Sequence, residues 1–187
     1  PNRWGATVNF TPWLQYIIPD IRHFYVAGYR NLGERSGVVG ASLTFFSLGR
    51  IQFTDAQGVS QGEYNASELA FSTSYARQIT PYFSAAASLR YVRSDLAGAQ
   101  NLGGISLNAA QAFAGDIAIY GFRPFRVRTG SDTLRMRFGY GVAITNIGNK
   151  IAYTSDPARR DFLPTNLRVS TAFTSDIDPV NSITLAV

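Results

Sequence analysis

Side chains that could perform catalysis are scarce in this chain of 187 residues. It contains one histidine, His23, and no cysteine, so a thiol nucleophile is excluded and only one imidazole could act as a base. His23 lies in the alternating stretch HFYVAGY, where the sequence identifies neither a nucleophile nor an acid as its partner. GxSxG, P-loop and dinucleotide-binding motifs are also missing. We therefore expect a structural histidine, no catalytic residues and no enzymatic activity.

Metal and cofactor binding are equally poorly supported. Without cysteine, the chain has no Cys-ligated metal site. The tetrapeptide TDAQ (54–57) lies near Glu63, but the regular acidic spacing of a calcium loop is missing. We expect no bound metal and no cofactor.

Arginine is the most distinctive polar residue of the chain. There are sixteen arginines and a single lysine, Lys150, and the formal net charge is +5. The planar guanidinium group suits ion pairs with carboxylates and contacts with phosphate. The densest basic cluster is only ARR (158–160), so we do not expect nucleic acid as a partner.

Apolar residues alternate with small or polar residues along most of the chain, a pattern typical of β-strands. In LRMRFGYGVAIT (134–145), six large apolar residues alternate with two arginines and four small residues. With this stretch the chain has about nine candidate strands and no convincing long helix. The other stretches are WGATVNFT (4–11), RHFYVAGYR (22–30), GVVGASLTFFSLG (37–49), ELAFSTSYARQ (68–78), YFSAAASLRYVRSD (82–95), GDIAIYGFR (115–123), LRVSTAFTS (167–175) and NSITLAV (181–187).

The connections between these stretches alternate between longer and shorter. In an up-and-down antiparallel meander, this alternation places all the long loops at one end, as in outer-membrane barrels. We expect an all-β, antiparallel up-and-down transmembrane β-barrel with strands of about 9–11 residues. The longer connections are PWLQYIIPDI (12–21), GRIQFTDAQGVSQGEYNAS (49–67), LAGAQNLGGISLNAAQAFA (96–114) and NIGNKIAYTSDPARRDFLPTN (146–166). The shorter ones are NLGERS (31–36), QITP (78–81), RPFRVRTGS (123–131) and DIDPV (176–180).

A soluble, adhesin-like β-sandwich would show the same alternation. The second face of the strands is rich in Gly, Ala and Ser with isolated arginines, which suits a crowded lumen better than a solvated sheet. In the barrel, the apolar faces would contact lipid and the charged residues of the other face would point into the lumen. The predicted lumen residues are Arg90, Arg135, Arg137 and Arg168, with Glu68, Asp116 and Asp132 as candidate carboxylate partners.

Four long stretches resemble one family closely, the PorV family of outer-membrane barrels from the Bacteroidota type IX secretion system. They are TPWLQYIIPDIRHFYVAGYR (11–30), FFSLGRIQFTDAQGVSQGEYNASELAFSTSYARQI (45–79), ASLRYVRSDLA (87–97) and GVAITNIGNKIAYT (141–154). The family is similar to FadL transporters and forms a barrel of fourteen strands. The resemblance therefore implies that residues 1–187 are a single partial barrel domain, an internal fragment without the signal peptide, the N-terminal strands and the closing strands.

The resemblance implies a carrier in the bacterial outer membrane, with its long loops outside the cell. Such a carrier binds the C-terminal signal domain of secreted cargo as it leaves the SprA translocon, also called Sov. It then delivers the cargo to the surface attachment complex that contains the sortase-like PorU, in contact with outer-membrane lipid and lipopolysaccharide. Alternatives are a FadL-like transporter of hydrophobic molecules and a lipopolysaccharide deacylation factor. The lumen arginines argue against the first, and the missing Ser–His–acid set argues against the second.

Partner contacts are expected in the long loops, because loops on a rigid scaffold commonly carry function. The apolar residues of PWLQYIIPDI (12–21), which lie between two prolines, could instead belong to an interfacial aromatic girdle. The loop IQFTDAQGVSQGEY (51–64) could plug the lumen. Arg159 and Arg160 could pair with Asp156 and Asp161 rather than with lipopolysaccharide phosphate. The candidate partner-binding residues are Trp13, Tyr16, Ile17, Phe53, Tyr64, Tyr153, Arg159 and Arg160.

Overall fold

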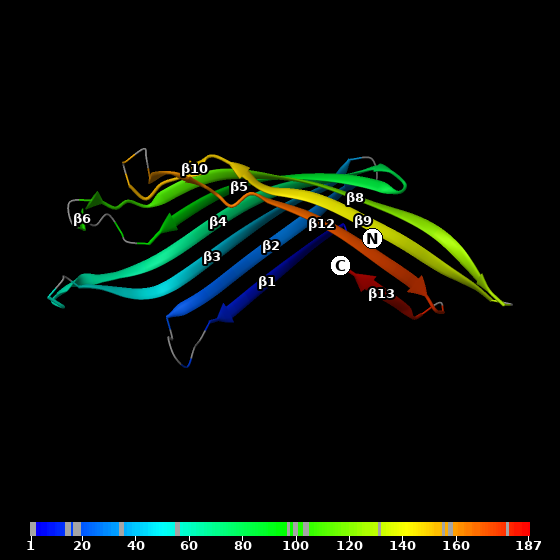
Figure 1. The fold of residues 1–187 in the computed structure, drawn as a ribbon, viewed down its shortest axis with the longest axis horizontal. Helices are drawn as coiled ribbons and strands as arrows, with labels where there is room; N and C mark the ends of the chain where they lie inside the picture. Colours follow the sequence, from blue (N-terminus) through cyan, green and yellow to red (C-terminus); the bar gives the residue numbers. More distant parts are fainter. Residues whose placement is uncertain are drawn as a thin grey trace.

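The chain folds into one large antiparallel sheet. The computed structural model describes residues 3–13, 16, 20–33, 36–54, 57–96, 98, 101–102, 105–130, 132–154, 156, 159–178 and 180–187. The sheet has nine strands in the order β1-β2-β3-β4-β5-β8-β9-β12-β13, so each strand pairs with its neighbours in the chain (Figure 1). Its strands are β1 (Trp4–Pro12), β2 (Ile21–Gly33), β3 (Gly37–Thr54), β4 (Ser60–Thr80), β5 (Phe83–Asp95), β8 (Ala110–Thr129), β9 (Asp132–Gly148), β12 (Asn166–Asp176) and β13 (Ser182–Ala186).

Two small hairpins lie within the long connections and were not predicted. One pairs β6 (Asn101–Leu102) with β7 (Ile105–Ser106), and the other pairs β10 (Lys150–Ile151) with β11 (Asp161–Phe162). In the part of the chain that the structure describes, no helix is long and apolar enough to span a membrane.

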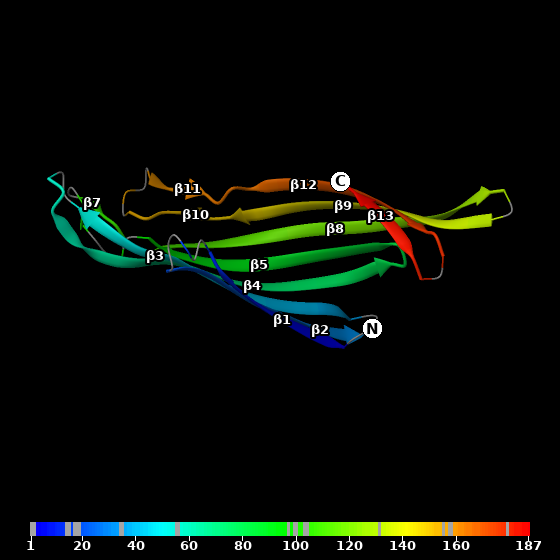
Figure 2. The same ribbon diagram turned by 90° about the horizontal axis from the view of Figure 1, so that it is seen from below.

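The sheet curves along its width, with β1 at one edge and β13 at the other (Figure 2). A continuous antiparallel meander of nine strands confirms the predicted all-β, up-and-down fold. Together, the curvature and the strand order are consistent with the wall of an up-and-down β-barrel.

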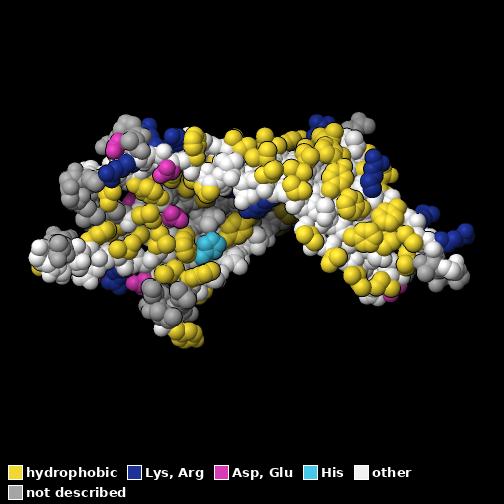
Figure 3. All heavy atoms as spheres, viewed as in Figure 1, with side chains coloured by type: hydrophobic (Ala, Val, Ile, Leu, Met, Phe, Trp, Pro, Cys, Tyr) yellow, Lys and Arg dark blue, Asp and Glu magenta, His cyan; other side chains and the backbone are white. Residues whose placement is uncertain are grey.

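The strand register separates the side chains into two different faces. The apolar face holds the large side chains of the alternating stretches, including Phe71, Leu89, Phe113 and Val169, which are 46–72% exposed. Over the right-hand half of Figure 3, where β9, β12 and β13 lie, apolar side chains form a broad surface. An exposed apolar surface of this extent needs an apolar covering.

The opposite face is lined by small side chains, and we call it the small-residue face. Along one row across the sheet, Ser42, Ser72, Arg90 and Ala114 lie directly opposite one another in register. Small residues on this face leave room for the polar side chains between them and for the loops that lie over it.

Tyrosine rings cover several strand glycines across the sheet. A methyl group at Gly121 would meet the ring of Tyr140, its neighbour across the β8–β9 pair, and one at Gly5 would meet the ring of Tyr29. An aromatic ring over a glycine restores the packing that the missing side chain would lose.

Strand lengths differ from the prediction, which is wrong for the long hairpins. Strands β3, β4, β8 and β9 have 18, 21, 20 and 17 residues rather than about 9–11. Most of the predicted loop 49–67 is the paired end of β3 and β4, and most of the predicted connection 123–131 belongs to β8. The connections that remain alternate less strictly, because 55–59 is no longer than 177–181.

The two ends of the sheet still differ. Connections 13–20, 55–59, 96–109 and 149–165 lie at one end, which we call the loop end. Connections 34–36, 81–82, 130–131 and 177–181 lie at the other, the turn end. In the last of these turns, hydrogen bonds from the Asn181 side chain and from the Val180 and Asn181 backbone amides hold the pKa of Asp178 below its ordinary value.

Candidate functional site

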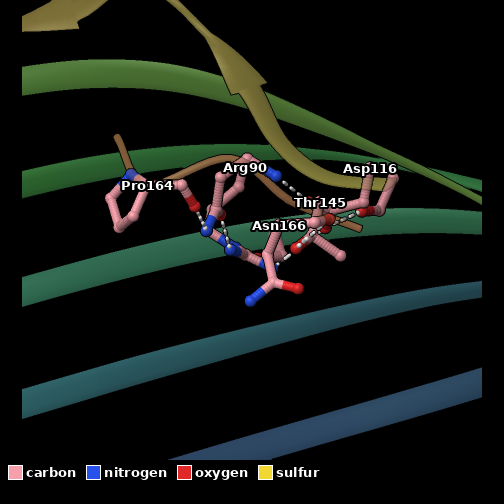
Figure 4. Close-up of polar contacts among 8 residues, drawn as sticks. Arg90, Asp116, Thr145, Pro164 and Asn166 are labelled. Atoms are coloured by element: carbon pink, nitrogen blue, oxygen red, sulfur yellow. Dashed lines mark hydrogen bonds and ion pairs between the residues drawn. The ribbon is translucent and has the colours of Figure 1, made fainter. Parts of the chain in front are cut away.

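An ion pair on the small-residue face joins β5 to β8. The Arg90 Nη2 atom lies 2.9 Å from Asp116 Oδ2, and Arg90 Nη1 donates to Asn146 Oδ1 at 2.8 Å (Figure 4). The Arg90 Nε group donates to the Ser72 hydroxyl at 3.2 Å. The two charged side chains are 32% and 15% exposed, so the pair is largely shielded from solvent.

Asp116 has hydrogen-bond partners for both carboxylate oxygens. The Ser88 hydroxyl donates to Oδ2 at 2.6 Å, and the Asn146 backbone amide donates to Oδ1 at 2.8 Å. A bulge between Gly115 and Ile117 positions the aspartate for these contacts. A buried ion pair is stable only when its remaining hydrogen-bonding capacity is satisfied, and this one is well satisfied.

Asn146 connects this network to the connection between β9 and β12. Its side-chain amide donates to the Pro164 carbonyl at 3.0 Å, and its own carbonyl accepts from the Thr165 hydroxyl at 3.1 Å. Its φ of 61° is in the left-handed region, which asparagine tolerates better than most residues. The charged network of the sheet therefore anchors one end of the longest connection.

A second series of hydrogen bonds anchors the other end of the same connection. The Tyr153 hydroxyl donates to Ser94 Oγ at 2.9 Å, and the Ser94 hydroxyl donates to Glu68 Oε1 at 2.7 Å. The Asn108 amide donates to the Tyr153 carbonyl at 2.8 Å, and a β-bridge joins Leu107 to Thr154. Connections 96–109 and 149–165 are thus tied to each other and to the sheet.

The described residues of these two connections lie over the loop end of the small-residue face, and we call them the loop cover. Four residues beneath the cover are among the most buried of the described chain: Ser94, Ala110, Ala112 and Ala114 are 1–3% exposed. In its described residues, the loop end is therefore tied to the sheet by several hydrogen bonds.

We predict that Tyr153→Phe loosens the loop cover. The substitution removes the hydroxyl that reaches Ser94, so local stability should fall by about 1 kcal/mol. Hydrogen exchange of peptides from 149–165 should then be several times faster. Tyr75→Phe is the matched control, because the Tyr75 hydroxyl donates to the Ser36 carbonyl at the turn end. Equal exchange in both variants would mean that Tyr153 does not hold the cover.

The hairpin formed by the ends of β3 and β4 also contacts the cover. Phe53 pairs with Gly62 near the hairpin tip and is half-buried. Tyr64 is half-buried, and a methyl group at Gly98 would meet its ring. Both predicted residues therefore belong to an ordered hairpin, and Tyr64 packs against the connection that follows β5.

The other predicted loop residues lie at the loop end in different environments. Trp13 is 55% exposed and lines a cavity of about 360 Å³ together with His23, Phe46 and Glu68. Tyr16 is fully exposed, and Ile17 lies outside the described residues.

The two loop arginines are both exposed. The Arg159 Nε atom lies 3.5 Å from Asp156 Oδ2, as the local ion-pairing alternative predicts. In the described residues, no carboxylate lies within 4 Å of Arg160, so the expected pairing with Asp161 is wrong.

All four predicted lumen arginines lie on the small-residue face by register. Their proposed carboxylate partners are partly wrong. Asp116 pairs with Arg90, Glu68 accepts from Ser94, and the Asp132 side chain is outside the description. Arg137 instead lies 3.5 Å from Asp176, a partner that sequence reasoning missed because it depends on the register between β9 and β12.

His23 contacts the Phe46 ring edge-on at 5.9 Å, in keeping with a structural role. Within the described residues, no three His, Asp or Glu side chains are grouped as metal ligands. The polar networks tie strands and loops together and leave exposed side chains around an ordered loop end.

An antiparallel meander with one apolar face and one small-residue face is consistent with a protein of the up-and-down β-barrel class. The chain belongs to the PorV family: the family model described as type IX secretion system protein PorV matches residues 1–187. In a search of curated proteins, none matches the chain.

Proposed function

We propose that this member of a type IX secretion family is an outer-membrane carrier of secreted cargo. In this proposal the apolar face contacts lipid and the loop end faces the outside of the cell. The C-terminal signal domain of the cargo docks on the loop end after it leaves a SprA-like translocon. The carrier then brings the cargo to an attachment complex that contains a PorU-like sortase.

The observation that carries this proposal is the loop cover. Hydrogen bonds from Tyr153 and Asn146 hold the longest connection against the sheet at both ends. Ordered loops lose little conformational entropy when a partner binds, so such a surface is suited to protein recognition. Exposed aromatic side chains at the loop end, Trp13, Tyr16 and Phe162, supply the kind of anchors that dominate binding energy in protein interfaces.

The polar character of the interior argues against the transporter alternative. A pathway for hydrophobic molecules needs a continuous apolar lining, whereas Arg90 and Asp116 lie in the middle of the small-residue face. The mainly apolar cavity beside Trp13 is a feature that favours a lipid-like ligand. Fatty acid recovered in equal amount with the purified barrel would support that second function.

The test uses the full-length barrel purified from outer membranes and the isolated C-terminal domain of a secreted cargo. We expect Tyr16→Ser to weaken binding by about tenfold, since a central aromatic anchor commonly contributes more than 1 kcal/mol. Tyr82→Ser is the matched control, because Tyr82 is also an exposed tyrosine but lies in the β4–β5 turn at the opposite end. Equal loss in both variants, or no binding to the unmodified barrel, would contradict the proposal.

A further inference from the structure

The formal charge of the chain is concentrated at the turn end. Among the described residues, the turn-end half of the sheet has three aspartates, Asp132, Asp176 and Asp178. It has eight arginines: Arg3, Arg30, Arg77, Arg123, Arg126, Arg128, Arg135 and Arg137. The excess of five positive charges equals the formal net charge of the whole chain, +5. Attraction for anionic partners is therefore expected at this end rather than at the loop end.

Four of these arginines lie together on the small-residue face of the β8–β9 hairpin. Arg126 is directly opposite Arg135 in register, and like charges in this position destabilise a strand pair. Arg128 and Arg137 flank them on the same face. Figure 3 shows basic side chains at the right-hand tip, where β8 and β9 end.

Little negative charge balances this group in the described structure. Arg137 lies 3.5 Å from Asp176, and both side chains are more than a third exposed. Among the described side chains, no carboxylate lies within 4 Å of Arg126, Arg128 or Arg135. An open cavity of about 390 Å³ lies between Arg126, Arg135, Arg137 and Asp176.

The same hairpin has a free strand edge. Pairing between β5 and β8 ends at Gly121, and the last contact is from the Phe122 amide to the Tyr82 carbonyl. Beyond it, β8 continues to Thr129, paired on its β9 side only. Because β5 begins directly after the two-residue β4–β5 turn, no strand of the described sheet covers 123–129 on that side.

We propose that the edge of β8 at 123–129 binds an extended acidic segment of a partner protein as an added β-strand. Main-chain hydrogen bonds to the free edge would hold the segment, as in other cases of β-strand addition. Arg126 and Arg128 are two residues apart and point to one face, so they match acidic side chains at alternate positions of the segment.

The arginines and Pro124 also make this edge selective. Charged side chains and proline on an edge strand oppose pairing with ordinary strands and with a second copy of the same edge. The arginines attract an acidic strand and disfavour neutral or basic strands. Specificity would therefore come from attraction and repulsion together. Phospholipid headgroups fit less well, since the four arginines lie on the small-residue face, opposite the apolar one.

The test measures binding of a labelled peptide to the full-length barrel in detergent, with aspartate and threonine alternating in the peptide. We expect binding that weakens with salt. A peptide with asparagine for aspartate, and an acidic peptide with methylated backbone amides, should each bind at least about tenfold more weakly. These comparisons use the unmodified protein, so they do not depend on the folding of a variant.

A pair of matched variants locates the site. Arg126→Gln with Arg128→Gln should reduce binding about tenfold, whereas Arg159→Gln with Arg160→Gln removes the same charge at the loop end and should leave binding unchanged. Equal binding of the methylated peptide would overturn strand addition, and sensitivity to the loop-end pair would overturn the location. Binding to phosphatidylglycerol vesicles that depends on Arg126 and Arg128, without peptide binding, would assign the arginines to lipid instead.

Discussion

Replacing Asp116 with alanine is expected to lower the free energy of unfolding of the barrel by about 2–4 kcal/mol. The substitution leaves the Arg90 guanidinium without its ionic partner in a largely buried place. It also removes the acceptors of the Ser88 hydroxyl and the Asn146 amide, so the anchor of connection 149–165 should weaken at the same time. Denaturant unfolding of the full-length protein, followed by intrinsic fluorescence, measures the change.

The control for this prediction is the second ion pair of the small-residue face. Asp176→Ala breaks the 3.5 Å pair with Arg137, whose side chain is 53% exposed, and should cost less than about 1 kcal/mol. Adding Arg90→Met to Asp116→Ala should recover part of the lost stability, because it removes the uncompensated charge. Equal losses for the two aspartate variants would show that burial of the Arg90 pair has no energetic consequence.

Gly148→Ala should have an effect of similar size, through sterics rather than charge. A methyl group at Gly148 would overlap the Phe113 carbonyl oxygen and lie 2.8 Å from the Ala114 Cα atom, both of them backbone atoms of β8. Backbone atoms cannot rotate away as a side chain can, so the β8–β9 pairing must shift where the loop cover begins. We expect a loss of about 2–3 kcal/mol in the same unfolding experiment.

Gly28→Ala is the matched substitution in another strand of the sheet. A methyl group there would meet only the Gly5 carbonyl oxygen, at an ordinary contact distance of 3.5 Å. It should change stability by less than about 1 kcal/mol, because alanine also restricts the unfolded chain. A Gly148 variant as stable as the Gly28 variant would mean that the sheet adjusts at the β8–β9 bulge without cost.

Strands could be predicted from the sequence because alternation is a local property. A strand between an apolar environment and a crowded interior shows its two faces in successive residues, as Leu134 and Arg135 do. The long hairpin at 49–67 was predicted as a loop because of its glycines and polar residues. In the structure, Gly49 and Gly62 have φ values of 81° and 117° in paired strands, and Gly49 lies at a register shift. Glycine in a strand can indicate a bulge as well as a loop.

Contacts between distant parts of the chain were the part that could not be predicted. Whether Asp116 would meet Arg90 or Arg137 depends on register, and a shift of a single residue would move it to the other face. The contact between Tyr153 and Ser94 joins residues 59 positions apart through a connection with no periodic pattern. The face on which each arginine lies can be predicted from local alternation alone. Its ion-pair partner can be predicted only from the relative position of two strands.

The order of the strands bears on how the protein folds. Each strand of the nine-stranded sheet pairs with the preceding and the following one, without a crossover. Hairpins with tight turns, such as β4–β5 and β8–β9, can form early because closing a short chain segment costs little entropy. The two connections of the loop cover join β5 to β8 and β9 to β12. These two strand pairs can therefore form only after a longer chain segment has closed. Formation of the covered loop end is therefore expected to be the slow step of folding. The sheet is expected to nucleate at the turn end.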